Sequence, residues 1–414
     1  MAMIAEVASS PSVPADVKLA NLARVLQEMR NADALSRSDV ARKAGISVAT
    51  AHRLISDLAE LGLVEEQPVA ADGIRLGRPP VVYRFRDDAA LLAGADVGNE
   101  TTRLAITTLS GRVLASQCLA SDRLGRQLAR TLAGRLAGMA GQIGKMNGWA
   151  GKAGPTGQSP GQLAGAGVGI ASAVDADGVL RAPPMHKKWD GLPLRTSLAT
   201  QLGCRVAVAQ DDHLSPIAEG SDQGTFPGTS SLLVLEIGRG IGVGMTLGGV
   251  PISGARHRFG RIAGWPVSCA AGPGRLPGQT LGACLAVGGL VSQYQAAGGS
   301  RDVRDGAALA TAVRSGDELA GAVFEWAARE VADVVGRLHL LCDPEAGVIG
   351  GGLARAYDLL EPVLSALLPP GLPVARSVLG EQAVVAGAVL VARSLAQSWL
   401  SDRLAHADHR LAPT

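Results

Sequence analysis

Aromatic residues are scarce in this sequence: phenylalanine, tryptophan and tyrosine together make up 3% of its 414 residues. Hydrophobic residues still account for 47% of the chain, and glycine occurs 54 times. A chain of this length and hydrophobicity can bury the cores of two or three domains, which excludes a largely disordered protein. Those cores must be built mainly from alanine, valine and leucine on tightly turned α/β scaffolding.

Net charge, paired cysteines and long apolar runs are also lacking. The formal net charge is +2, so any attraction to nucleic acid or membranes must come from local clusters. The five cysteines form no CxxC pair, a usage typical of a reducing compartment rather than of a disulfide scaffold. No export signal and no apolar run of about 20 residues is found, so we expect a cytoplasmic protein without a membrane partner.

The N-terminal region predicts three short helices and a two-stranded wing. Apolar residues at helical spacing begin at Asp16, and the capping pattern SRSD starts a second helix at Ser36. Ser47 can cap a third helix, which Gly62 ends. The strand-like runs LVEEQ and VVYRF then flank the loop AADGIRLGRPP. We predict a winged helix-turn-helix DNA-binding domain over 16–87, after a disordered tail over 1–15.

Positive charge gathers locally in these helices, where four basic residues between 37 and 53 face a single acid, Asp39. Such a patch suits phosphate contacts. If the third helix buries Leu54, Ile55 and Leu58, its opposite face is free to read base edges. The predicted DNA-binding residues are Arg37, Ser47, Ala49, Thr50, His52 and Arg53, with Arg75 and Arg78 on the wing. The alternative is a small helical bundle with an ordinary charged surface.

From Leu91 the chain alternates apolar strands, glycine loops and helices, which predicts an α/β domain over 88–400. Helices are expected over 121–140 and 319–341, and a flexible Gly/Pro/Ser-rich insertion over 141–162. Residues 401–414 are assigned to a C-terminal tail.

Three glycine loops in this domain follow strands, as loops that approach phosphates do. Their residues are Asp96 and Gly98; Gly238, Arg239 and Gly240; and Gly350 and Gly351. Asp211 follows the strand VAVAQ, where its carboxylate can act as a general base or simply cap a helix.

The order of motifs resembles regulators of the ROK family over residues 18–396. It runs from LSRSDVARKAGISVATAHRLISDLAELGLVEE and GRPP through ADVGNETTRLAI, GVGIASAVD, WDGLPL, QDDHLSPIAEG, GRGIGVGM and VIGGGLA to AVVAGAVLVAR. The resemblance implies an α/β fold with a two-lobed, actin-like ATPase domain shared with sugar kinases. Only the regulators of the family carry the winged helix, so the resemblance favours regulation over catalysis.

Two phosphate loops depart from the family's kinase pattern. Asn99 and Glu100 stand where kinases have Gly and Thr, and the Glu100 carboxylate should repel ATP. Arg239 stands where the second loop has Thr. We therefore predict vestigial phosphate loops, a vestigial base at Asp211, no ATP cofactor and no kinase activity.

The implied sugar and zinc sites are eroded as well. Met185, Gln210 and Arg261 replace sugar-contacting residues of the family, while Asp211 is kept. By resemblance the effector contacts would be Gln210, Asp211, His213 and Arg261. Trp265 lies near the place of the zinc-binding histidine, and only Cys269 and Cys284 remain of the thiols, so we predict no zinc.

The sequence thus predicts a transcription regulator, most simply a repressor, that binds inverted-repeat double-stranded DNA as a homodimer or homotetramer. A carbohydrate or sugar-derived effector would control it. The alternatives are an ATP-dependent carbohydrate kinase and an effector-independent DNA-binding or scaffold protein.

Overall fold

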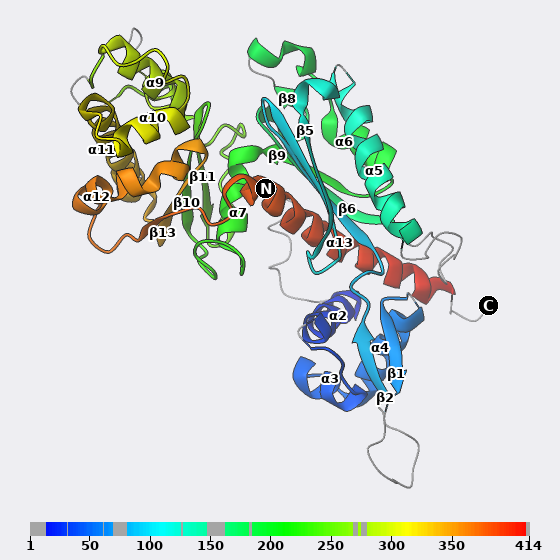
Figure 1. Ribbon diagram of the computed structural model, residues 1–414. Helices are drawn as coiled ribbons and strands as arrows, with labels where there is room; N and C mark the ends of the chain where they lie inside the picture. Colours follow the sequence, from blue (N-terminus) through cyan, green and yellow to red (C-terminus); the bar gives the residue numbers. More distant parts are fainter. Residues whose placement is uncertain are drawn as a thin grey trace.

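The computed structural model describes residues 14–30, 32–60, 62–68, 81–125, 127–146, 162–181, 184–267, 272–274 and 280–410. Three bodies follow one another: an N-terminal helical domain, a first α/β lobe and a second α/β lobe, with a long C-terminal helix returning beside the first two (Figure 1). None of the helices in these ranges is both long and apolar enough to cross a membrane.

The N-terminal domain has the predicted helices and wing strands. They are α2 (Pro14–Arg30), α3 (Arg37–Ala44), α4 (Val48–Glu60), β1 (Val64–Pro68) and β2 (Val81–Phe85). Ser36 caps α3 by accepting the Asp39 N–H at 3.2 Å, and Gly45 ends it in the left-handed conformation. β1 and β2 pair antiparallel, and the wing tip between them lies outside the described residues.

The first lobe, lobe I, is a five-stranded sheet in the order β5-β4-β3-β6-β9. Its main elements are β3 (Leu91–Val97), β4 (Thr101–Thr107), β5 (Val113–Ala120), α5 (Leu128–Met146), β6 (Leu163–Ile170), α6 (Leu194–Leu202) and β9 (Val206–Gln210). A small hairpin, β7 (Ala173–Val174) with β8 (Leu180–Arg181), follows β6.

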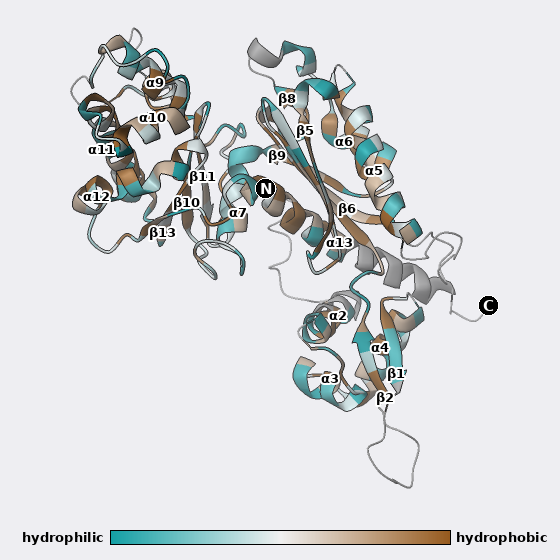
Figure 2. Ribbon diagram, in the orientation of Figure 1, coloured by the Kyte–Doolittle hydropathy of each residue, from teal (hydrophilic) through white to brown (hydrophobic). Residues whose placement is uncertain are grey.

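The second lobe, lobe II, repeats that plan with a sheet in the order β12-β11-β10-β13-β14. Its elements are β10 (Leu232–Ile237), β11 (Ile241–Leu247), β12 (Val250–Pro251), α8 (Leu281–Cys284), α9 (Val287–Ala296), α10 (Gly306–Arg314), α11 (Glu318–Cys342), β13 (Ala346–Gly350), α12 (Tyr357–Leu367) and β14 (Val374–Arg376). In each lobe three antiparallel strands are extended by two parallel ones. Apolar residues concentrate along the central strands of both sheets (Figure 2).

Two elements join the bodies: the short helix α7 (Ser215–Glu219) and the long helix α13 (Ala383–Arg410). α13 lies across β3 and β6 of lobe I and also contacts α7. Its residues Val389, Ala392 and Ala396 belong to the same buried cluster as the cores of α2, α3 and α4. The N-terminal domain is therefore packed against lobe I and α13 through a shared hydrophobic core.

Three predicted boundaries are wrong. The helix expected over 121–140 is a 3-10 turn at Ser121–Leu124 followed by α5, which begins at Leu128 and runs to Met146, into the predicted insertion. Residues 147–161 of that insertion lie outside the described residues. The predicted tail over 401–414 is helical to Arg410 as the end of α13, and α2 already begins at Pro14, inside the tail assigned to 1–15.

Candidate functional site

Helix α4 has one buried and one exposed face. Ala51, Leu54, Ile55 and Leu58 are buried, as the helical spacing predicts, whereas the predicted reading residues lie on the opposite face. Of those, Ser47, Ala49, His52 and Arg53 are exposed and Thr50 is half-buried. The Ser47 hydroxyl caps the helix by accepting the Thr50 N–H at 3.1 Å, and it lies 2.8 Å from the Thr50 hydroxyl. Arg53 and His52 are therefore best placed to reach bases.

Arg37 has a second role inside the domain. Its guanidinium lies over the Tyr83 ring, 5.1 Å from the ring centre, and its Nε is buried without a hydrogen-bond partner. Arg30 lies similarly over Phe85 at 5.2 Å. Such contacts hold α2 and α3 against β2. The other two predicted contacts, Arg75 and Arg78, lie outside the described residues.

The predicted phosphate loops come together where the two lobes meet, because each follows the end of a central strand. Asp96 is near the end of β3 and Gly98 follows it, Gly238–Gly240 connect β10 to β11, and Gly350–Gly352 follow β13. A Cβ on Gly351 would lie 2.6 Å from the Ile237 carbonyl oxygen, so the second and third loops are in close contact. Gly351 also has a φ of 73°, which favours glycine.

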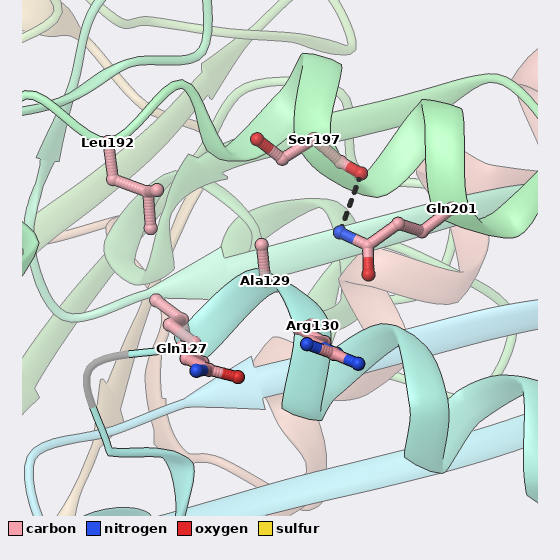
Figure 3. A pocket seen from close by; sticks show the side chains of 7 residues that line it. Gln127, Ala129, Arg130, Leu192, Ser197 and Gln201 are labelled. Carbon is pink, nitrogen blue, oxygen red and sulfur yellow. Dashed lines mark hydrogen bonds between the residues drawn. The ribbon is translucent and has the colours of Figure 1, made fainter.

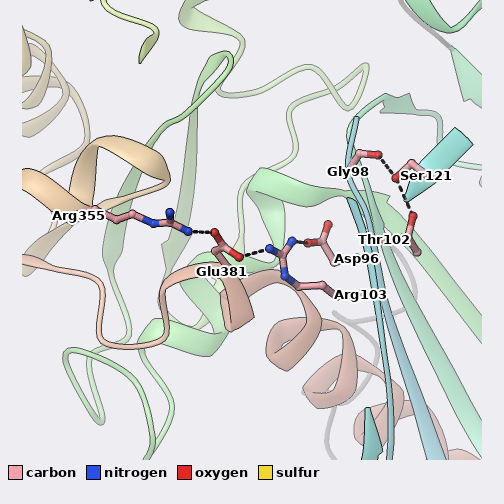
Figure 4. A network of polar contacts seen from close by, with 7 residues as sticks. All are labelled: Asp96, Gly98, Thr102, Arg103, Ser121, Arg355 and Glu381. Carbon is pink, nitrogen blue, oxygen red and sulfur yellow. Dashed lines mark hydrogen bonds and ion pairs between the residues drawn. The ribbon is translucent and has the colours of Figure 1, made fainter. Parts of the chain in front are cut away.

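Charged side chains bridge the lobes at these loops (Figure 4). Arg103 of lobe I lies 3.6 Å from Asp96, and it pairs with Glu381, which also pairs with Arg355 of lobe II. Glu100, in the β3–β4 turn, pairs with Arg239 in the β10–β11 loop. Burial raises the pKa of Asp96 to about 6, although Arg103 opposes the shift.

A group of half-buried acids lies beside the loops, at the predicted effector residues. Burial raises the pKa of Asp211 well above its usual range, and the neighbouring Asp212 adds to the shift. Gln210 donates to Asp212 at 2.9 Å, while its own side-chain oxygen is buried without a partner. Glu236, inside the apolar strand β10, has its pKa raised by burial to about 8. Because like charges crowd there, the group favours protonated or cation-paired carboxyls.

Of the remaining predicted effector residues, His213 lies within 3.4 Å of the Phe259 carbonyl oxygen, and burial lowers its pKa. Burial raises the pKa of Asp212, and the exposed Arg261 lies near enough to oppose that shift. The structure thus brings Gln210, Asp211, His213 and Arg261 into one region. Sequence reasoning missed Asp212 and Glu236. A lone glutamate within LLVLEI was the available signal for Glu236.

Two further glycines of the motif GRGIGVGM, Gly242 and Gly244, serve packing. A Cβ on Gly242 would overlap the Asp212 carboxylate, and one on Gly244 would overlap the Asp212 carbonyl oxygen. These glycines of β11 therefore admit the turn Asp211–His213. Gly240 has open space around it, so only the start of the motif GRGIGVGM remains available to a ligand.

A separate hollow of about 220 Å³ lies on lobe I between the start of α5 and α6 (Figure 3). It is lined by Gln127, Leu128, Ala129, Arg130, Leu192, Ser197 and Gln201. Gln201 donates across its own helix to the Ser197 carbonyl oxygen at 3.0 Å. None of the predicted site residues lines this hollow.

Two cysteines, Cys269 and Cys284, remain of the zinc site that the family resemblance implies. Cys284 is buried, and Cys269 lies outside the described residues. Within the ranges given above, no three His, Cys, Asp or Glu side chains are grouped so that they could hold a metal ion. The side chain of Met185 is not described.

Comparisons with known proteins divide the chain at the same place as the structure. Residues 92–394 match the model of the ROK family, and residues 19–68 match the IclR helix-turn-helix domain. A kanosamine kinase of Amycolatopsis mediterranei is 30% identical over 56% of this chain and 77% of its own length. A transcriptional regulator of Mycobacterium bovis is 26% identical over 90% of this chain and 84% of its own length.

Among solved structures, a ROK family transcriptional regulator described as a homologue of the Escherichia coli MLC protein has a similar fold. The TM-score is 0.71 at 19% identity, covering 94% of this chain and 99% of the other. The N-terminal domain, the two lobes and their order along the chain are thus shared with a known architecture.

Proposed function

Since the chain belongs to the ROK family and carries a helix-turn-helix at its N-terminus, we propose that it is a sequence-specific, DNA-binding regulator of transcription controlled by a carbohydrate-type effector. The observation that carries the proposal is the exposed face of α4, which presents His52 and Arg53 opposite a fully buried apolar face. We further propose that the regulation is repression.

Symmetric operators match symmetric proteins, so we expect binding to an inverted repeat as a dimer or a dimer of dimers. Lys43, Arg42 and Arg53 are exposed on or beside the reading helix and supply charge for the phosphates. Arg42 is held at 2.9 Å by Asp39 and is partly neutralised. The salt dependence of binding should therefore rest more on Lys43 and Arg53.

The effector region is the group of Gln210, Asp211, His213 and Arg261. It offers carboxyl, amide, imidazole and guanidinium groups, which can hydrogen-bond to the hydroxyls of a sugar or to a substituent on it. The kanosamine kinase relative acts on an amino sugar, which gives a first compound to test. We propose that this group binds effector without phosphorylating it and that neither ATP nor zinc is a cofactor.

The packing around α13 supplies a physical route between effector and DNA. Asp87, between the DNA-binding domain and β3, accepts the Ser110 N–H and hydroxyl at 2.5 and 2.6 Å, and Arg393 of α13 donates to the Ser110 carbonyl at 3.3 Å. A shift of α13 relative to the sheet would thus move the DNA-binding domain. Coupling of this kind requires that effector bind one arrangement more tightly than the other.

Selection from randomised and genomic DNA fragments, at stated salt, tests the proposal. Wild type should enrich a palindrome, and Arg53→Ala should weaken its binding by about 10-fold or more, the loss expected for one base or phosphate contact. Arg301→Ala, at an exposed arginine of lobe II, is the matched control and should bind as wild type. No enrichment by wild type, with or without sugars, would refute the proposal.

The alternative function is a carbohydrate kinase, favoured by the kanosamine kinase relative and by Asp211 at the end of β9. An ADP-release assay over a panel of sugars and amino sugars decides between the two. We expect no turnover. Turnover that Asp211→Asn abolishes would establish the enzyme.

A further inference from the structure

One of the ion pairs described above joins the lobes at the two residues where the sequence departs from a nucleotide-binding pattern. Glu100 stands in the first phosphate loop and Arg239 in the second, and they pair with each other. Taken singly, a carboxylate in a phosphate loop repels a nucleotide and an arginine crowds it. Taken together, they attract the two loops to each other directly, where a nucleotide would join the loops through its phosphates.

Glu381 forms the second bridge. It lies in the 3-10 turn Gly380–Gln382, directly before α13, and its carboxylate is shared by Arg103 of lobe I and Arg355 of lobe II. Arg103 is only 18% exposed and also faces Asp96, so its charge is tightly surrounded by two carboxyls. The bridge therefore fixes the position at which α13 begins as well as the separation of the two lobes.

We propose that Glu100 and Glu381 are built-in substitutes for nucleotide phosphates, whose pairing with arginines across the interlobe junction holds the lobes at one separation without nucleotide. The proposal concerns lobe arrangement alone and does not rest on DNA binding. It explains why the chain can keep an ATPase-like architecture after both loops have changed. It also predicts that the junction is governed by salt instead of by ATP.

The strength of the bridge follows from its exposure. Arg239 and Glu100 are 65% and 59% exposed, so their pair is screened by water and should shift the ratio of separated to bridged lobes by only about two- to fivefold. The Glu381 bridge uses the less exposed Arg103 and should matter more. Because exposed pairs are screened by ions, raising the salt concentration should act like breaking them.

Small-angle X-ray scattering of the full chain, fitted to a bridged and a separated arrangement, measures that ratio. Glu100→Arg should raise the separated fraction, and the double variant Glu100→Arg/Arg239→Glu should restore the wild-type curve. Asp358→Arg is the matched control, because Asp358 pairs with Arg314 at 2.8 Å at similar exposure but entirely within lobe II. It should leave the lobe separation unchanged.

Two controls accompany the scattering: a check that each variant folds, and a measurement with added nucleotide. Circular dichroism checks each variant, and Glu100→Gln, which only removes the charge, replaces Glu100→Arg if the latter misfolds. We expect wild type to lose its bridged fraction at high salt and to keep the same curve when ATP and Mg²⁺ are added. Unchanged scattering for Glu100→Arg or Glu100→Gln, a double variant that stays separated, or closure by ATP would overturn the proposal.

Discussion

The seating of α13 on lobe I gives the sharpest prediction about stability. A Cβ placed on Gly167 of β6 would overlap the Ala388 carbonyl oxygen, and one on Gly165 would lie 2.6 Å from the Ala392 carbonyl oxygen. A Cβ on Gly94 of the neighbouring strand would lie 2.6 Å from a Val389 side-chain methyl and 3.0 Å from the Val385 carbonyl oxygen. A stripe of glycines thus lets the backbone of the helix lie directly on the sheet.

We expect Gly167→Ala to lower the free energy of unfolding. Overpacking of a core costs roughly 1–3 kcal/mol, and the upper end applies here because the obstacle is helix backbone, which cannot rotate away as a side chain can. Urea unfolding followed by circular dichroism measures the loss. Since Val389 and Ala392 also contact the core of the DNA-binding domain, operator affinity should fall with it.

Gly134→Ala is the matched control, because Gly134 lies in the exposed face of α5 with open space around its Cα. Alanine there should stabilise the chain by about 0.5–1 kcal/mol through helix propensity. If Gly167→Ala were neutral or stabilising like Gly134→Ala, the close seating of α13 would be refuted.

Three further predictions concern single side chains. Glu236→Gln should stabilise the fold most at high pH: burial raises the pKa of Glu236 from 4.5 to about 8, so wild-type stability falls as the pH rises through that window, and equal pH slopes for the two proteins in urea unfolding would contradict this. Ser36→Ala should lower the free energy of unfolding by about 1 kcal/mol because it removes the cap of α3. Ser38→Ala, at an exposed position two residues further along the chain, should lower it less when both variants are compared by thermal unfolding. Arg37→Ala should lower both stability and DNA affinity because it loses its contact with Tyr83, while Arg53→Ala should lower affinity alone; an unaltered melting temperature for Arg37→Ala would dismiss the packing role.

The DNA-binding domain could be predicted from sequence because its signals are local. Ser36, Gly45 and Ser47 each act on backbone groups within one helical turn of themselves. The spacing of Leu54, Ile55 and Leu58 directly defines the buried face of α4. The second role of Arg37 could not be foreseen, since Tyr83 is 46 residues further along the chain. Local pattern gives a residue's helix and face but not its distant partner.

The same limit explains the errors in the larger domain. The predicted end at residue 400 cut through α13, which continues to Arg410. The glycines of β3 and β6 seat the part of this helix from Val384 to Leu395 on the sheet, a contact between segments that are far apart in the sequence. Gly238 and Gly240 of GRGIGVGM are predicted to approach phosphates, whereas Gly242 and Gly244 of the same motif make room for Asp212, which lies in the turn after β9. A glycine in the sequence indicates that another group approaches the backbone closely, but only the fold shows which group it is.

The two departures from the kinase pattern illustrate how that limit affects functional inference. Glu100 and Arg239 are 139 positions apart, and each by itself indicates damage to a phosphate loop. Their pairing across the junction changes the inference, because a second departure that neutralises the first is favoured where the lobes must stay associated without nucleotide. The proposed loss of ATP binding is then compatible with keeping a two-lobed domain. A regulator needs the second property and has no use for the first, provided that its effector distinguishes two lobe arrangements.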